Sequence, residues 1–369
     1  MKKTKILIDG RLLEGGPNGI RRYIEVFANI LSNNGYEIYI AVPGIPAQDI
    51  NLDPKISVIK LPKNKLINQF YLNKNLIKKT NVDIYWGPAH RLPFGKLNVP
   101  SVLTIHDLAF KSVPSKLKWR TLIAEKLFFS SSVRKASKVI AVSEFTKNEI
   151  TKYYPQHSHK VHRIYNLIDH HKFPQNNVLQ KVSNWQHGHL LHVGTIEPRK
   201  NVIKLIEAFL ELPPNTQKQF PLNLAGNWGW ISDKEKTYIQ FLASKGQVNL
   251  VIGPSDNTLA QLYESCHCLI SLSIYEGFGL PVLEALNYNK PSIVTKGSAQ
   301  AEIAGPACFE VTANDTDEIL KAIRTICSDK SAYNRLRVAA SERKDAFLTS
   351  LAIQTFEHLV HSIMSKDKQ

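Results

Sequence analysis

The chain has 369 residues, which is enough for two domains of ordinary size. Hydrophobic residues make up 43% of it and charged residues 21%, a composition typical of globular proteins rather than disordered ones. No stretch approaches the roughly 18 consecutive apolar residues of a membrane-spanning helix. The residues after Met1 lead directly into an apolar strand without a signal peptide, so we expect a cytoplasmic protein.

The net charge of +16 is unevenly distributed. Residues 1–175 contain 28 Lys and Arg against 12 Asp and Glu, an excess of 16, whereas the remainder contains 19 of each. The first half is therefore expected to face an anionic partner: a membrane surface, an acidic acceptor or a nucleic acid. The cysteines lie in apolar or helical patterns without the second ligand pair of a zinc site, which predicts buried free thiols and no metal. They are Cys266, Cys268, Cys308 and Cys327.

The chain opens with an apolar strand, Lys5–Asp9, followed by a glycine-containing loop from Gly10 to Gly19. Residues 20–31 then have the apolar spacing of a helix. A strand, a glycine loop and a helix in this order are typical of the opening of a Rossmann-like unit, although the glycines do not match the G-x-G-x-x-G pattern. Taken alone, the loop could equally be a flexible surface loop.

Two later strands, predicted within residues 83–90 and 101–107, end in polar side chains. In open α/β sheets, ligands bind beyond the carboxyl ends of the strands. His106 and Asp107 are therefore candidates for a functional site, although a single histidine can also be structural.

Two segments of the first half combine apolar and basic residues. Residues 63–79 place a helical apolar stripe among five lysines, and residues 115–138 interleave aromatic with basic side chains. Such segments suit the interface of an anionic bilayer. For residues 63–79, a helix packed on its own sheet with solvated lysines is an equally good interpretation.

The polar residues 172–186 are the predicted linker to a second domain, which opens with a strand at His189–Gly194. Arg199 and Lys200 follow this strand and precede a predicted helix, Val202–Leu212. Strands alternating with helical patterns favour a parallel sheet. The further strands are expected at Leu222–Gly226, Val248–Gly253, Cys268–Ser273 and Pro291–Thr295.

Residues 274–286 read as a strand end, a turn with two glycines and the start of a helix. Pro281 suits the first helical turn, and Gly277 and Gly279 would let a ligand approach the backbone. The helix start directs N–H groups and a positive dipole end toward the turn, which predicts a phosphate site.

Charged residues flank this turn. In a parallel sheet Arg199 and Lys200 would lie beside it, where they could neutralise a diphosphate leaving group. Glu276 and Glu284 would repel a phosphate, so we expect them to accept hydrogen bonds from hydroxyls on either side of it. A nucleotide sugar has such hydroxyls on its ribose and on its hexose.

The run EGFGLPVLE, from Glu276 to Glu284, resembles the signature of retaining glycosyltransferases of family 4. That family has the GT-B fold, an α/β fold of two Rossmann-like domains whose parallel sheets face each other across a cleft. The resemblance covers Gly10 to about Glu342 and implies domains at residues 1–175 and 186–345. It also implies that a C-terminal helix, within residues 346–369, packs back on the first domain. Residues 165–168 depart from the family, in which a proline and a glycine often precede the aspartate.

The resemblance also implies roles for individual residues. Glu276 would orient the donor hexose, Glu284 the ribose, and His106 would lie near the sugar. Neither a metal nor another cofactor is expected, because no D-x-D motif is present at the turn and the nucleotide sugar is a substrate. The implied catalytic residues are Glu276, His106, Arg199 and Lys200; the implied donor-binding residues are Gly15, Gly16, Gly19, Gly194, Gly277, Phe278, Gly279, Leu280 and Glu284.

The sequence therefore favours a retaining hexosyltransferase. The run VGTIEPRKN is similar to bacterial enzymes that use GDP-mannose, which makes mannose the preferred sugar. The expected acceptor is a glycan or lipid-linked intermediate of cell-surface polysaccharide such as O-antigen, at the inner face of the membrane.

Several alternatives stay open. UDP- or dTDP-sugar donors fit the same motifs, and an epimerase or phosphorylase can share the architecture. A donor-binding protein without activity also fits. A nucleic-acid-binding protein would need a helix-turn-helix or an aromatic and basic sheet face, and neither is evident.

Overall fold

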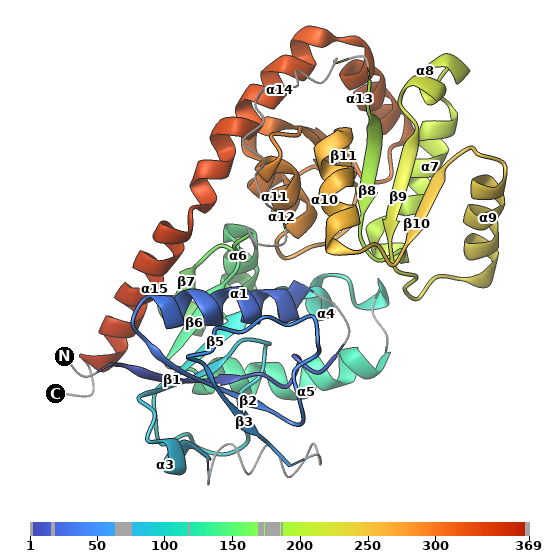
Figure 1. Ribbon diagram of the computed structural model, residues 1–369. Coiled ribbons are helices and arrows are strands. Elements are labelled where there is room, and N and C mark those ends of the chain that lie inside the picture. Colours follow the sequence, from blue (N-terminus) through green and yellow to red (C-terminus); the bar gives the residue numbers. More distant parts are fainter. Residues whose placement is uncertain are drawn as a thin grey trace. The chain divides into compact units, whose positions relative to one another are not determined.

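The computed structural model describes residues 3–15, 19–62, 76–116, 119–168, 173, 185 and 187–365. The chain forms two compact units (Figure 1). Unit 1 comprises Met1–Leu167 and Phe347–Gln369, and unit 2 comprises Ile168–Ala346. Each unit is built on its own parallel sheet with helices on both faces, so the predicted α/β class with two Rossmann-like units is confirmed.

The sheet of unit 1 has, within the described residues, the strand order β3-β2-β1-β4-β5-β6-β7, and every pairing is parallel. The strands are β1 (Lys5–Asp9), β2 (Glu37–Val42), β3 (Ser57–Lys60), β4 (Ile84–Gly87), β5 (Ser101–Ile105), β6 (Lys138–Ala141) and β7 (Val161–Arg163). The α-helices among the described residues of this unit are α1 (Gly19–Asn33), α3 (Ile77–Thr80), α4 (Ala109–Ser112), α5 (Trp119–Lys135), α6 (Glu144–Tyr153) and α15 (Thr349–Met364).

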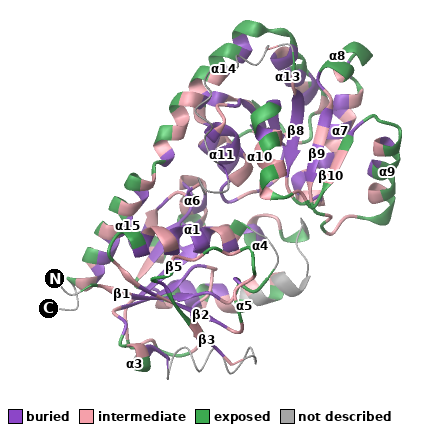
Figure 2. Ribbon diagram, in the orientation of Figure 1, coloured by how far each residue is buried: buried purple, intermediate pink, exposed green. Residues whose placement is uncertain are grey.

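Alternation along the strands of unit 1 creates two apolar layers, as the two faces of a pleated sheet require. Ile6 and Ile8 of β1 point into a layer with α1 and α15, whereas Leu7 points into the opposite layer with α5 and α6. Both faces of the sheet are thus covered, and the central strands are buried (Figure 2).

The C-terminal helix α15 belongs to unit 1, although the preceding helix lies in unit 2. Its apolar face packs into the layer of α1, and Phe356 is fully buried there. The ring of Phe356 lies 5.6 Å from that of Trp86 on β4, centroid to centroid. The return of the chain end to the first unit, which the family resemblance implied, is therefore observed.

The sheet of unit 2 has, within the described residues, the order β10-β9-β8-β11-β12-β13, again with every pairing parallel. The strands are β8 (His189–Val193), β9 (Leu222–Gly226), β10 (Asn249–Ile252), β11 (Cys266–Ser271), β12 (Ser292–Thr295) and β13 (Cys308–Val311). The α-helices are α7 (Val202–Leu210), α8 (Pro214–Gln219), α9 (Asp233–Ser244), α10 (Asp256–Ser265), α11 (Leu280–Asn287), α12 (Ala299–Ala304), α13 (Thr316–Ser328) and α14 (Lys330–Arg343).

The core of unit 2 lies between its sheet and the helices α7, α9, α13 and α14. The strand order reverses beside β8, so the loops after β8 and β11 are neighbours at the carboxyl edge of the sheet. This is the topological switch point at which ligands bind in open α/β sheets. Both loops carry residues that the sequence predicts to be functional.

The elements predicted for unit 2 lie within two residues of their predicted bounds. The helix predicted to reach Leu212 ends at Leu210, and the strand predicted from Cys268 begins at Cys266. Most of the predicted basic segment 63–79 and most of the predicted linker 172–186 lie outside the described residues.

Candidate active site

The turn between β11 and α11 has the backbone geometry that its glycines predict. Gly279 caps α11 with φ of 109°, a conformation that residues with a side chain rarely adopt. A Cβ at this position would also lie 3.0 Å from Cγ of Gln300. Pro281 lies in the first turn of α11, where its missing N–H costs no hydrogen bond.

A short 3₁₀ turn, η4 (Pro198–Lys200), presents the two predicted cations after β8. Asn201 ends this turn in the left-handed conformation, with φ of 59°, and donates from Nδ2 to the carbonyl oxygen of Ala313 at 2.5 Å. The backbone N–H of Ile274 donates to the carbonyl oxygen of Arg199 at 2.8 Å. The backbone thus ties η4 directly to the turn that follows β11.

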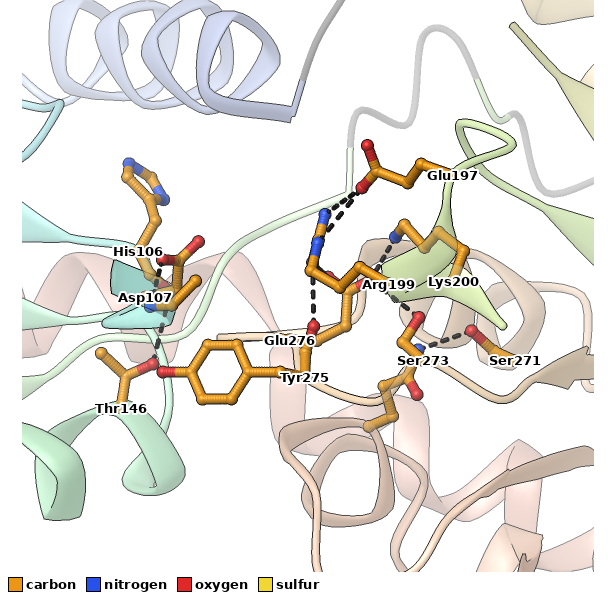
Figure 3. A network of polar contacts seen from close by, with 12 residues as sticks. His106, Asp107, Thr146, Glu197, Arg199, Lys200, Ser271, Ser273, Tyr275 and Glu276 are labelled. Atoms are coloured by element: carbon orange, nitrogen blue, oxygen red, sulfur yellow. Dashed lines mark hydrogen bonds and ion pairs between the residues drawn. The ribbon is translucent and has the colours of Figure 1, made fainter. Parts of the chain in front are cut away.

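The side chains of Arg199 and Lys200 converge on Glu276 (Figure 3). Lys200 Nζ forms an ion pair with Glu276 Oε1, and Arg199 Nη1 lies 3.5 Å from Glu276 Oε2. Ser273 Oγ donates to the same carboxylate at 3.0 Å. Burial alone would raise the pKa of Glu276, but Lys200 and Arg199 lower it to about 2, so the carboxylate is charged at neutral pH.

Glu197 holds the guanidinium of Arg199 from its other side. Arg199 donates from Nε and Nη2 to Glu197 Oε1, at 3.1 Å and 2.8 Å, and from Nη1 to the carbonyl oxygen of Tyr275 at 2.9 Å. Sequence reasoning missed this acid, although its place two residues before Arg199 in the run EPRK was a usable signal. The sequence prediction assigned Glu276 to a sugar hydroxyl and the two cations to a diphosphate. In the structure, both cations instead lie against Glu276.

Glycines allow the backbone segments of this site to approach closely. A Cβ on Gly194 would lie 3.4 Å from Cε of Lys200, an ordinary contact distance, so what favours glycine here is its φ of 154°. A Cβ on Gly226 would lie 2.0 Å from the carbonyl oxygen of Gly194, a distance that no side chain tolerates. The same two chain segments also meet further along, where the N–H of Gly229 donates to the carbonyl oxygen of Ile196 at 3.0 Å.

Glu284 lies on α11 and is 5% exposed. Its Oε2 accepts a hydrogen bond of 2.6 Å from the hydroxyl of Tyr263 on α10, which is fully buried. Phe278, a predicted donor-binding residue in the turn, is also buried, and Leu280 begins α11. Tyr263 is a second residue that the motif alone did not indicate.

The predicted residues of unit 1 occupy loops at the carboxyl edge of its sheet. His106 follows β5, and its backbone carbonyl accepts a hydrogen bond from Thr146 Oγ1 at 3.3 Å (Figure 3). Burial lowers the pKa of His106 to about 3, so the ring is neutral at pH 7. Its Nε2 lies 2.7 Å from the carbonyl oxygen of Pro88 and must therefore carry the ring proton, which leaves Nδ1 as an acceptor.

The glycine loop after β1 is only partly described. Gly15 O accepts a hydrogen bond from Arg21 Nη1 at 2.5 Å, and Gly19 is the first residue of α1. Arg21 is 3% exposed and thus ties the loop to the buried side of α1. The predicted donor-binding residue Gly16 lies outside the described residues.

All four cysteines are free thiols, as predicted. Cys266, Cys268 and Cys327 are also buried as predicted, whereas Cys308 is partly exposed. Within the part of the chain that the structure describes, no group of three or more His, Cys, Asp or Glu side chains is arranged to hold a metal ion. Among the helices of the described ranges, none combines the length and apolarity needed to cross a membrane.

Comparison with known proteins places both units in glycosyltransferase families. Residues 17–172 match the family described as Glycosyltransferase Family 4, and residues 180–343 match Glycosyl transferases group 1. The O-antigen chain mannosyltransferase B of Escherichia coli is 30% identical over 254 residues, which are 67% of this chain and 66% of that protein. The chain thus spans slightly less than two thirds of that relative.

Two further proteins extend the comparison. The O-antigen chain mannosyltransferase RfbU of Salmonella typhimurium is 25% identical over 70% of this chain and 69% of its own length. A sucrose-phosphate synthase from Thermosynechococcus elongatus superposes with a TM-score of 0.78 over 99% of this chain and 100% of its own, at 18% identity. The structural match confirms the GT-B fold.

Proposed function

This chain belongs to the family 4 and group 1 glycosyltransferases, and we propose that it transfers a hexose from a nucleoside diphosphate sugar to an acceptor hydroxyl with retention of configuration. The observation that carries the proposal is the pair of cations, Arg199 and Lys200, fixed beside the glycine turn of unit 2. As the bond between the sugar and the β-phosphate breaks, negative charge builds on that phosphate. Cations held in place before the reaction stabilise this charge without reorganisation.

Arg199 and Lys200 are held differently and would stabilise the leaving phosphate in different ways. Arg199 is held by Glu197 and the carbonyl of Tyr275, so its guanidinium is oriented in advance. Lys200 presents a point charge whose ion-pair partner is Glu276. A hydroxyl of the donor hexose would donate to Glu276, as the family resemblance implies. This chemistry requires no metal ion.

The donor we propose is GDP-mannose, and the acceptor a glycan or lipid-linked intermediate of cell-surface polysaccharide. The two relatives described above support the sugar, because both are mannosyltransferases of O-antigen chains. We also propose that His106 contributes to catalysis, because the run TIHDLAF resembles the family segment whose histidine contacts the donor sugar.

The test is a panel of nucleotide sugars, each incubated with the full chain and assayed for hydrolysis and for thermal stabilisation. With EDTA present to chelate metal ions, GDP-mannose is expected to be hydrolysed faster than the other nucleotide sugars. NMR spectra recorded before mutarotation should show that the released mannose is the α-anomer. Lys200→Ala and Arg199→Ala should each lower kcat by about a hundredfold, because each removes a donor to the leaving group. Hydrolysis of no nucleotide sugar, or inversion of the anomer, would contradict the proposal.

We propose further that unit 1 associates with an anionic membrane surface. On α5, Ile123 and Leu127 are 49% and 64% exposed, one helical turn apart, within a stretch of sequence rich in Lys and Arg. The variant Ile123→Ser/Leu127→Ser should lose binding to vesicles that contain phosphatidylglycerol. Val58→Ser, at an exposed apolar position on β3, is the matched control and should bind as the parent chain does.

A further inference from the structure

Glu284 is held by a tyrosine that no sequence motif indicates. The hydroxyl of Tyr263 donates to Glu284 Oε2 at 2.6 Å, a short distance typical of a hydrogen bond to a charged acceptor. Tyr263 has no exposed surface and Glu284 is 5% exposed, so water competes little for this bond. The bond fixes the rotation of the carboxylate about its terminal torsion, which is otherwise broad.

The ring of Tyr263 is itself fixed by aromatic neighbours. Tyr288 lies parallel to it at 6.0 Å between centroids, and Phe173 meets it edge-on at 6.1 Å. The carbonyl of Phe173 accepts a hydrogen bond of 3.2 Å from Nδ2 of Asn287, the last residue of α11. These contacts hold the Tyr263 ring in one position beside α11, the helix that carries Glu284, so its hydroxyl donates in a fixed direction.

We propose that Tyr263 is a positioning residue that aims the Glu284 carboxylate at the ribose hydroxyls of the donor, and thereby selects ribonucleotides. The inference rests on the proposed function, which assigns Glu284 to the ribose. A buried acceptor with a fixed direction favours a ligand whose hydroxyl meets it, and a ligand without that hydroxyl leaves it unpaired. Discrimination between a ligand with that hydroxyl and one without it should therefore depend on the phenol of Tyr263, which is fully buried.

The experiment compares nucleotides with and without ribose hydroxyls. Dissociation constants for GDP and for 2′,3′-dideoxy-GDP are measured by calorimetry, with UDP and 2′,3′-dideoxy-UDP in parallel. The full chain should bind one ribonucleotide at least about tenfold more tightly than its dideoxy analogue. Tyr263→Phe keeps the ring and its packing but removes the donor, and should shrink that ratio by about fivefold while dideoxy binding stays nearly unchanged.

The matched control is Tyr288→Phe, which removes a hydroxyl from the neighbouring ring. That hydroxyl is buried and has no hydrogen-bond partner among the described residues, so the ratio should keep its parental value. Melting temperatures of both variants are measured alongside. If Tyr263→Phe weakens the two nucleotides equally, or leaves the ratio unchanged, Tyr263 has a structural role and the inference is wrong.

A third variant separates this inference from the proposed function. Glu284→Gln should abolish the discrimination if Glu284 contacts the ribose. If Glu284→Gln abolishes it and Tyr263→Phe does not, only the positioning role is wrong. If nucleotides bind and Glu284→Gln leaves the ratio unchanged, the ribose contact is wrong and the inference fails with it, while transfer itself stands. If no nucleoside diphosphate binds the full chain, both proposals are wrong.

Discussion

Glu276 is a nearly buried carboxylate that stays charged because two cations lie against it. The same two cations are those expected to meet the leaving phosphate. Glu276 therefore has a structural effect as well as its proposed role toward the donor sugar, since it holds Lys200 in place beside Gly194. A charged network of this kind couples the stability of unit 2 to pH.

Replacing Glu276 should reveal that coupling. Its pKa of about 2 in the folded chain lies below its ordinary value of 4.5, so the charge stabilises the fold above pH 4.5 and the effect is lost as pH falls toward 2. The difference corresponds to about 3 kcal/mol at neutral pH. Glu276→Gln should therefore lower the free energy of unfolding at pH 7, and its deficit should shrink by more than about 1 kcal/mol at pH 3.5.

Urea unfolding of the parent chain and the variant between pH 7 and 3.5 measures this deficit. Glu207→Gln is the control, because its carboxylate pairs with Lys204 on the exposed face of α7 and such pairs contribute little. Stability curves for the parent chain and Glu276→Gln that run parallel across the pH range would contradict the interpretation.

Glu197 is predicted to matter for turnover more than for stability. Its carboxylate accepts two N–H groups of Arg199, and the neutral amide of Glu197→Gln would accept them more weakly. The guanidinium would then lose its fixed direction toward the glycine turn. We expect kcat/KM for the donor sugar to fall about tenfold, with a small change in melting temperature. Steady-state kinetics beside Glu207→Gln measure this, and an unchanged kcat/KM would exclude the positioning role.

At the scale of elements, the site depends on how closely two loops approach. The loop after β8 carries Arg199 and Lys200. It is supported by the end of β9 and the loop that follows, through hydrogen bonds from Gly194 N–H to Ala225 O and from Ile196 N–H to Asn227 O. Gly226 makes this approach possible, with φ of 153° and no side chain. The cations are therefore positioned by a loop that contributes no charge to the site.

Gly226→Ala should disrupt both the fold of unit 2 and its ligand site. The added Cβ would lie 2.0 Å from Gly194 O, so the backbone must move, at an expected cost of about 3 kcal/mol in unfolding free energy. Gly246→Ala is the control, since φ is 69° there but nothing lies within 4 Å of the added Cβ. Chemical denaturation should show a loss of about 1 kcal/mol for the control. Nucleotide affinity should fall in Gly226→Ala alone, and equal affinities would contradict this account.

The element pattern of both units follows from sequence, whereas the connections inside the site do not. Apolar strands alternating with helical patterns predict parallel sheets, and the run from Gly277 to Pro281 predicts the turn and the start of α11. The pairing of Glu197 with Arg199 and of Tyr263 with Glu284 depends on side-chain directions in three dimensions. Residue spacing along the chain carries no information about those directions. Tyr263 and Glu284 lie on different helices, and their contact depends on the packing of both.

At the scale of the whole molecule, the two units have separate apolar cores. Two separate stretches of the chain, one at each end, form the first unit. The periodicity of residues 346–364 predicts a helix but not the surface that it covers. That surface came from the family resemblance, and the structure places α15 beside α1 in unit 1. The stability of unit 1 should therefore depend on residues that are synthesised after all of unit 2.

Phe356→Ala tests this dependence. The Phe356 side chain is fully buried among Trp86, Tyr36 and the apolar face of α1, so its removal should cost unit 1 about 3–5 kcal/mol. Amide hydrogen exchange should become faster in β1, β2 and β4 and stay unchanged in β8 to β13, because the core of unit 2 contains no residue of α15.

Leu351→Ala, on the same helix but 48% exposed, is the matched control and should leave exchange in both units near the parental rates. If Phe356→Ala accelerates exchange equally in β8 to β13, the two units unfold as one cooperative body. The C-terminal helix would then stabilise the whole chain, because loss of its packing in unit 1 would also destabilise the strands that carry the cation site.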